Sequence, residues 1–132
     1  MRMRIRTAVL LFLTAIALSA CVQSTTAGIN NVDAQSFLAK IADSSVTVID
    51  VRSAEEYAEG HLVNSININV ESDQFSTQIA SLDKEKEYAL YCRSGRRSTL
   101  AAQQMASSGF TAITNYNQGG FTELAQLGAA TN

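Results

Sequence analysis

From Asp33 onward, segments with apolar residues at helical spacing alternate with short apolar runs typical of strands. In DAQSFLAKIAD, residues 33–43, apolar residues recur at helical spacing behind Asp33, a residue type that caps helix N-termini well. VTVID, residues 46–50, is a short β-branched run of the kind that forms a buried parallel strand. The pattern therefore predicts a helix followed by a strand.

Helical and strand-like patterns continue to alternate to the end of the sequence. Strand-like runs are SININV, EYALYC and FTAITNY, and helical patterns occur in SAEEYAEG, DQFSTQIASL, residues 96–108 and FTELAQLG. SININV alternates apolar and polar positions, which predicts one covered face. The side chains expected to face the core from SININV and from the longest helix are Ile66, Ile68, Val70, Leu100, Ala101 and Met105.

Strands that alternate with helices need crossover connections. Such connections are right-handed and give a mostly parallel sheet with helices on both faces. The sequence therefore predicts a single α/β domain. In sheets of this type, ligands and reacting groups lie at the carboxyl ends of the strands, where loops lead into helices.

The first 20 residues differ from the rest. Arg2, Arg4 and Arg6 precede an uncharged, mostly apolar stretch over residues 7–20, which is shorter than the roughly 20 residues that span a bilayer as a helix. A basic start, a short apolar run and small residues at its end are typical of a secretory signal peptide. The stretch runs into LSAC, which resembles the lipobox of bacterial lipoproteins. This resemblance implies a lipid on Cys21.

The lipobox resemblance also implies a division of the chain and a location. Residues 1–20 would be the cleaved lipoprotein signal peptide, residues 21–29 a flexible tether from the lipidated cysteine, and residues 30–130 the folded domain. Several acyl chains on one residue anchor a protein stably. Val22 after the cysteine implies sorting to the outer membrane, so we expect the domain at the periplasmic face of a bacterial membrane. A plain secretory signal peptide is the alternative.

Cleavage would change the charge of the protein. The full sequence has 10 basic and 12 acidic residues, and without the three leader arginines 7 basic and 12 acidic residues remain, so the formal charge is 7 minus 12, or −5. An acidic domain argues against nucleic acid as a partner.

Only two cysteines occur in the sequence, and a lipid on Cys21 would leave Cys92 unpaired in an oxidising compartment. A disulfide between the two, or a buried and inert Cys92, are the alternatives. The surroundings of Cys92 argue against burial. It ends a strand-like run and precedes the longest helix, whose free N–H groups and dipole would stabilise a thiolate.

Three arginines follow the cysteine closely, at positions 93, 96 and 97. Arginine in the first turn of a helix works against the helix dipole. An anion that Arg93, Arg96 and Arg97 attract therefore explains them better than helix stability does. Gly95 suits a loop that turns sharply and directs its amides inward. A chance basic cluster with an ordinary turn glycine is the alternative interpretation.

The stretch YCRSGRRS resembles the active-site loop of the rhodanese family of sulfurtransferases. VIDVRSAEEYAEGHLVNSININV and GFTAITNYNQGGF resemble two further motifs of that family. The likeness spans about residues 30–127 and is greatest to small, single-domain, periplasmic rhodaneses. It implies a compact α/β domain on a five-stranded parallel sheet. Departures at Leu62, Asn64 and Phe121 bear on packing and not on chemistry.

This resemblance implies that sulfur is transferred through Cys92. The Cys92 thiolate would take a sulfane sulfur from thiosulfate or another small anionic donor, and the persulfide would pass it to cyanide, a thiol or an acceptor protein. No cofactor and no metal is implied, and we expect a monomer. The residues that would bind the substrate, through loop amides and guanidinium groups, are Arg93, Ser94, Gly95, Arg96, Arg97 and Ser98.

Three polar residues outside the loop receive a mainly structural interpretation. Asp50 and Arg52 are expected to hold each other, with orientation of the loop as the functional alternative. His61 is the only histidine of the chain, and in the resemblance this position is structural.

Two other functions stay open from the sequence. A phosphatase or arsenate reductase of the same fold would place an arginine six residues after the cysteine, where this chain has Ser98. Because Arg97 comes one residue early, we expect a loop sized for sulfur. The second alternative is a non-catalytic rhodanese-like module that binds a partner or senses oxidants through Cys92.

Overall fold

The computed structural model describes residues 28–132, so the expected signal peptide, the lipidated Cys21 and residues 22–27 of the expected tether lie outside the described residues. A five-stranded sheet, all parallel, forms the centre of the domain in the order β1-β5-β4-β2-β3. The predicted single α/β domain is confirmed. The strands are β1 (Ile29–Val32), β2 (Thr47–Asp50), β3 (Ile66–Asn67), β4 (Glu87–Tyr91) and β5 (Ala112–Tyr116).

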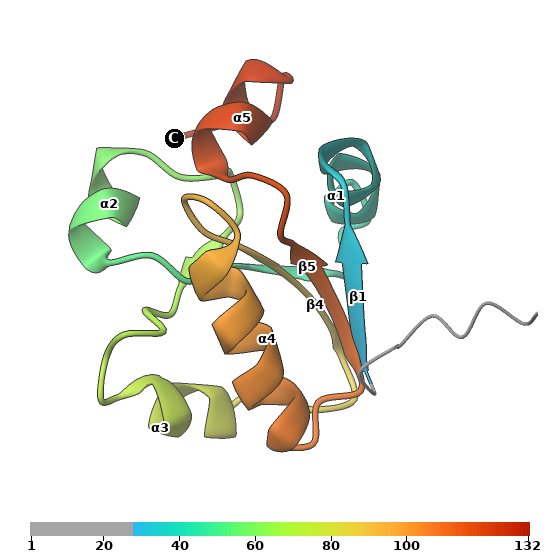
Figure 1. Ribbon diagram of the computed structural model, residues 1–132, viewed down its shortest axis with the longest axis vertical. Helices are drawn as coiled ribbons and strands as arrows, with labels where there is room; N and C mark the ends of the chain where they lie inside the picture. Colours follow the sequence, from blue (N-terminus) through green and yellow to red (C-terminus); the bar gives the residue numbers. More distant parts are fainter. Residues whose placement is uncertain (1–27) are drawn as a thin grey trace, which may run out of the picture.

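Helices cover both faces of the sheet (Figure 1). One apolar cluster joins the sheet to α3 and α4, and the other joins its opposite face to α1 and α5. Within the described residues, no helix is both long and apolar enough to cross a membrane. The helices are α1 (Ala34–Ile41), α2 (Ala54–Glu59), α3 (Phe75–Ala80), α4 (Arg96–Ser107) and α5 (Phe121–Gln126).

Local capping explains where the first two helices begin. The Asp33 carboxylate accepts a hydrogen bond from the Ser36 N–H at 2.8 Å, as expected for the N-cap of α1. Ser53 and Glu56 form a reciprocal capping box at the start of α2. Glu56 is therefore held close to the end of β2, and this placement matters for the site described below.

Strand β1 was not foreseen. The tether was expected to extend through residue 29, but Ile29 already pairs with Ile113 of β5, and the strand continues to Val32. Its sequence, INNV, is half polar because β1 is an edge strand and only Ile29 is fully buried. The expected tether is thus shorter, and β1 supplies the fifth strand of the sheet.

Two expected core positions are wrong. Ile66 is 40% exposed, because β3 is a two-residue edge strand and the chain turns inward only after it, to bury Ile68 and Val70. Leu100 is 42% exposed. Helix α4 instead turns the small Ala101 and Ala102 towards the sheet together with Met105, and small side chains allow close approach of the helix.

Candidate active site

The chain between β4 and α4 forms a tight loop around one sulfur atom. Cys92 directly follows β4, and Gly95 adopts a left-handed conformation with φ +91° that turns the chain into α4. The Gly95 N–H donates a hydrogen bond to Cys92 Sγ at 3.1 Å. Only glycine adopts this backbone geometry without strain. The stretch from Cys92 to Ser98 is called the Cys92 loop below.

The backbone amides of the loop determine the acidity of the thiol. Burial alone would raise the pKa of Cys92, but N–H groups of Ser98, Ser94 and Gly95 act on the sulfur and together hold the pKa of the Cys92 thiol below its ordinary value. These are the amides at the head of α4, where a helix leaves its first N–H groups unpaired. The geometry therefore favours a thiolate.

The side chain of Cys92 is fully buried, which contradicts the expectation from its sequence context. The residue follows β4 directly, and its side chain belongs to the apolar cluster between the sheet and α4, together with residues such as Leu90 and Ala101. The loop amides close over the sulfur from the other side. Burial here does not make the thiol inert, because the same enclosure directs N–H groups at it.

The segment between β5 and α5 packs against the Cys92 loop through backbone atoms. The Phe121 N–H donates to the Cys92 carbonyl at 2.9 Å. A Cβ atom at Gly120 would lie 1.9 Å from the Arg93 carbonyl oxygen, and one at Gly95 would lie 2.3 Å from the Asn117 carbonyl oxygen. Backbone meets backbone at both places, so side chains are excluded there. The second glycine of the NQGGF stretch is thus needed for close packing against the Cys92 loop.

The two serines of the loop have different surroundings. Ser98 is buried, and its hydroxyl donates to the carbonyl oxygens of Gly95 at 3.2 Å and Tyr116 at 3.1 Å. Ser94 is exposed. The Ser98 hydroxyl therefore ties the loop to β5. Both serines act on the sulfur through their N–H groups, and the Ser98 side chain also helps to lower the pKa of the Cys92 thiol.

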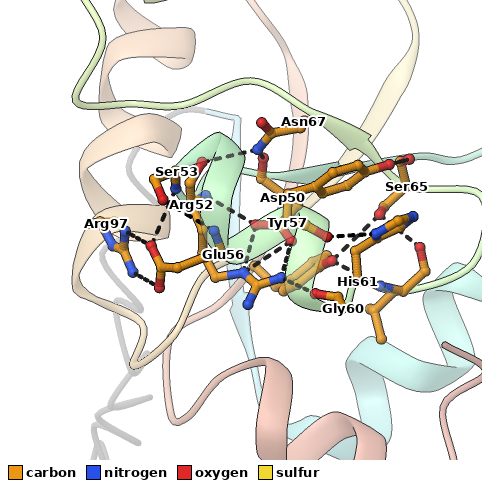
Figure 2. Close-up of polar contacts among 12 residues, drawn as sticks. Asp50, Arg52, Ser53, Glu56, Tyr57, Gly60, His61, Ser65, Asn67 and Arg97 are labelled. Atoms are coloured by element: carbon orange, nitrogen blue, oxygen red, sulfur yellow. Dashed lines mark hydrogen bonds and ion pairs between the residues drawn. The ribbon is translucent and has the colours of Figure 1, made fainter. Parts of the chain in front are cut away.

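The arginines were expected to be available to an anion, but the structure pairs one of them within the protein. Arg97 donates from Nη1 and Nη2 to the two oxygens of Glu56 at 2.7 and 2.9 Å (Figure 2). This pairing, together with the Ser53 N–H and against the effect of burial, lowers the pKa of Glu56 from 4.5 to about 2. Only 13% of the Arg97 side chain and 28% of the Glu56 side chain are exposed.

The other two arginines are more accessible. Arg96 is exposed and lies 3.9 Å from Glu71, which also approaches Arg97 at 3.7 Å. Arg93 is exposed, and no carboxylate within the described chain lies within 4.0 Å of it. Sequence reasoning missed both glutamates. The capping box could have placed Glu56 near β2, but no sequence pattern relates Glu71 to the loop.

The expected pairing of Asp50 with Arg52 is confirmed. Arg52 donates from Nε and Nη2 to the Asp50 carboxylate, with the shortest contact at 2.6 Å, and also to the Gly60 carbonyl at 2.7 Å (Figure 2). Its guanidinium lies 4.4 Å from the centre of the Phe121 ring. The buried pair thus connects the end of β2 to α2 and to the start of α5.

His61 has a structural environment, as expected. Its ring stacks on Tyr57 with the ring centres 3.7 Å apart, and Nδ1 lies 2.8 Å from the Tyr57 carbonyl oxygen. Tyr57 in turn donates its hydroxyl proton to the Ser65 carbonyl oxygen at 2.6 Å. These contacts hold the turn after α2.

A cavity of about 390 Å³ lies beside the Cys92 loop. Its volume can hold a small molecule. Two hollows of about 340 and 350 Å³ lie elsewhere, one beside α1 with a mostly apolar lining and one beside α4 with a mostly polar lining. The residues that line the cavity beside the loop include Arg52, Glu56, Glu59, Gly60, Arg93 and Phe121.

Comparison with known sequences gives a consistent result. The profile of the family described as "Rhodanese-like domain" matches residues 33–126. The provisionally assigned sulfurtransferase YtwF of Bacillus subtilis is 36% identical over 72 residues, which cover 54% of this chain and 68% of YtwF. A sulfurtransferase of Allochromatium vinosum is 26% identical over 92 residues, which cover 69% of this chain and 84% of that protein.

Some relatives are longer than this chain. YrkF of Bacillus subtilis, provisionally assigned as a sulfur carrier protein, is 31% identical over 88 residues, and the match covers 66% of this chain but 46% of YrkF. The chain therefore spans about half the length of that relative.

Solved structures resemble the fold. The rhodanese-like domain of the Alr3790 protein from Anabaena superposes with a TM-score of 0.68 at 22% identity, covering 77% of each chain. The human single-domain sulfurtransferase superposes with a TM-score of 0.59 at 26% identity, covering 73% of this chain and 95% of that one.

Proposed function

This chain belongs to the rhodanese-like domain family, and we propose that it is a sulfurtransferase that carries a sulfane sulfur as a persulfide on Cys92. The observation that carries the proposal is the enclosure of Cys92 Sγ by loop N–H groups at the head of α4, which lowers the pKa of the thiol. A thiolate is the nucleophilic form of cysteine.

In the first half of the reaction, the Cys92 thiolate attacks the outer sulfur of thiosulfate or a related donor. The new Cys92 S–S bond forms as the S–S bond of thiosulfate breaks, and sulfite leaves with the bonding electrons. The terminal sulfur of the persulfide carries the negative charge. The amides of the Cys92 loop would donate to that charge, as they do to the thiolate.

In the second half, a thiolate or cyanide attacks the terminal sulfur of the persulfide. The Cys92 S–S bond breaks, the Cys92 thiolate is restored, and the acceptor leaves as a persulfide or as thiocyanate. The cavity between Arg93 and Phe121 is the space from which we expect a small acceptor to approach. Its position beside the residue that follows Cys92 supports this assignment.

We also propose that the protein is a lipoprotein, anchored through Cys21 at the periplasmic face of a bacterial membrane and sorted to the outer membrane. The support is the sequence pattern over residues 1–22 alone. Intact mass of the protein extracted from membranes tests it. A mature chain that begins at an acylated Cys21 is expected, and an uncleaved or unacylated chain would contradict the proposal.

Intact mass also tests the sulfur-transfer proposal. Incubation with thiosulfate, a thiosulfonate or an organic persulfide should add the mass of one sulfur atom to the wild type and nothing to Cys92→Ser. Cyanide should then remove the added sulfur and yield thiocyanate. If none of these donors modifies Cys92, the proposed function is wrong.

A further inference from the structure

Five charged side chains lie on the Cys92 loop or pair with its arginines, and they include two glutamates. We call this set the charged rim. Without the glutamates, the loop would present three positive charges to a donor. With them, the formal charge of the rim is three minus two, or +1. The members of the charged rim are Arg93, Arg96, Arg97, Glu56 and Glu71.

Arg97 is already bound to an anion of the protein's own. Its two terminal nitrogens make parallel hydrogen bonds to Glu56, which is the paired geometry that guanidinium groups also use for oxyanions of ligands. A donor that used Arg97 in this way would have to displace a carboxylate that is mostly shielded from water and that also accepts from the Ser53 N–H. Leaving a shielded charge unpaired is costly. Arg97 therefore stays paired with Glu56.

Glu71 adds a negative charge that the arginines hold only loosely. Its carboxylate lies 3.9 Å from Arg96 and 3.7 Å from Arg97, which are longer than the hydrogen bonds of the Glu56 pair. It follows the buried Val70 on the segment that leads from β3 to α3. An anionic donor that approaches the charged rim meets this carboxylate. Coulomb repulsion scales with the charge of the donor, so a dianion is repelled about twice as strongly as a monoanion.

We propose that Glu71 and Glu56 determine donor specificity by lowering the charge of the rim from +3 to +1, so that a dianion such as thiosulfate loses most of the advantage over monoanionic donors that three unpaired arginines would give it. Monoanionic thiosulfonates and persulfides of small thiols or proteins can then compete with thiosulfate as donors. This inference rests on the proposed sulfur-transfer function. It replaces the expectation that three free arginines gather a dianion.

Two donors with the same leaving chemistry test the inference. Thiosulfate is a dianion and methanethiosulfonate a monoanion, and each gives its outer sulfur to Cys92 while sulfite or methanesulfinate leaves with the bonding electrons. The measured quantity is the ratio of kcat/KM for thiosulfate to kcat/KM for methanethiosulfonate. In Glu71→Gln this ratio should rise about two- to fivefold at low ionic strength, and the rise should shrink in high salt, because Glu71 is half exposed.

Glu85→Gln is the matched control. It removes the same charge from an exposed position before β4, at the end of the sheet opposite to Cys92. The ratio should not change in this variant. Glu56→Gln is a second variant, since glutamine can still accept from the Ser53 N–H, and it should raise the ratio more than Glu71→Gln does.

The outcomes separate the two proposals. Equal changes for both donors in Glu71→Gln, or the same change of the ratio in Glu85→Gln, would overturn the specificity inference while the sulfur-transfer function stands. If neither donor leaves a sulfur on Cys92 of the wild type, both proposals fall together.

Discussion

Arg97, in the first turn of α4, is bound through both of its terminal nitrogens to Glu56 in α2, at 2.7 and 2.9 Å. The two residues are 41 positions apart in the sequence, and their pair joins α2 to α4 beside the Cys92 loop. Since Glu56 also caps α2, one carboxylate fixes the start of α2 and the head of α4 together. The shape of the loop therefore depends on a contact with a residue outside it, Glu56.

Loss of this pair should destabilise the fold measurably. We expect Arg97→Ala to lower the free energy of unfolding by about 1 to 3 kcal/mol, since it leaves a shielded carboxylate without its partner. Urea unfolding of both single variants and of the double variant with Glu56→Ala would give the coupling energy. The Lys40–Glu87 pair is the control, because both side chains are about one-third exposed and its coupling should stay under about 1 kcal/mol. A coupling of Arg97 to Glu56 no larger than the control would contradict the prediction.

The same pair predicts how stability changes with pH. The pKa of Glu56 falls from 4.5 to about 2 on folding, so its contribution to stability is complete above the unfolded value and is lost as the pH falls from 4.5 towards 2. Between pH 6 and pH 3, the wild type should therefore lose more stability than Glu56→Gln, by on the order of 1 to 2 kcal/mol. Urea midpoints at the two pH values measure the difference. Equal losses in the two proteins would show that Glu56 is not the titrating group.

Gly120 should be essential for the geometry of the loop. In Gly120→Ala the new Cβ would lie 1.9 Å from the Arg93 carbonyl oxygen, so the Cys92 loop or the segment after β5 must shift. Because small displacements of reacting groups are costly, we expect persulfide formation to slow roughly tenfold or more. Gly128→Ala is the control, since no atom lies within 4 Å of its new Cβ, although φ +98° makes it strained. Full activity of Gly120→Ala with unchanged folding would contradict this packing argument.

The acidity of Cys92 should depend on amides more than on Arg96. Loop N–H groups lower the pKa of the thiol against the effect of burial, and Arg96 extends into solvent. The pH midpoint of iodoacetamide alkylation should therefore lie below the ordinary value for cysteine in the wild type and stay there in Arg96→Gln. A midpoint that moves upward in Arg96→Gln would mean that this arginine tunes the sulfur.

Much of the architecture was accessible from the sequence because strands and helices alternate with clear periods. Cys92 was placed correctly at the junction of a strand and a helix, and the pairing of Asp50 with Arg52 was expected. Burial of Cys92 was missed, since the enclosing amides come from a loop whose turn depends on Asn117 and Gly120.

Other features follow from tertiary packing alone. Strand β1 has a half-polar sequence because only one side of an edge strand is paired, and such strands leave a weak pattern. On α4, Ala102 is buried against the sheet and Leu100 is exposed, because a small side chain allows the close approach of the helix to the sheet. Glu71 reaches Arg97 only because the segment before α3 returns past the head of α4. No local pattern of the sequence predicts this contact between Glu71 and Arg97.

The parallel direction of the sheet has a consequence for orientation. Ile29 lies level with Tyr88, since both pair with Ile113, so the start of β1 is four positions before Cys92, or about 13 Å along the strands. If Cys21 is lipidated as proposed, residues 22–28 form a tether that reaches at most about 25 Å. This tether would join the domain at the amino ends of the strands, at the end of the sheet away from Cys92, and its reach exceeds the roughly 13 Å between the two levels. The anchor would therefore not obstruct the Cys92 loop, and dissolved thiols and soluble carriers could reach it while the protein stays attached.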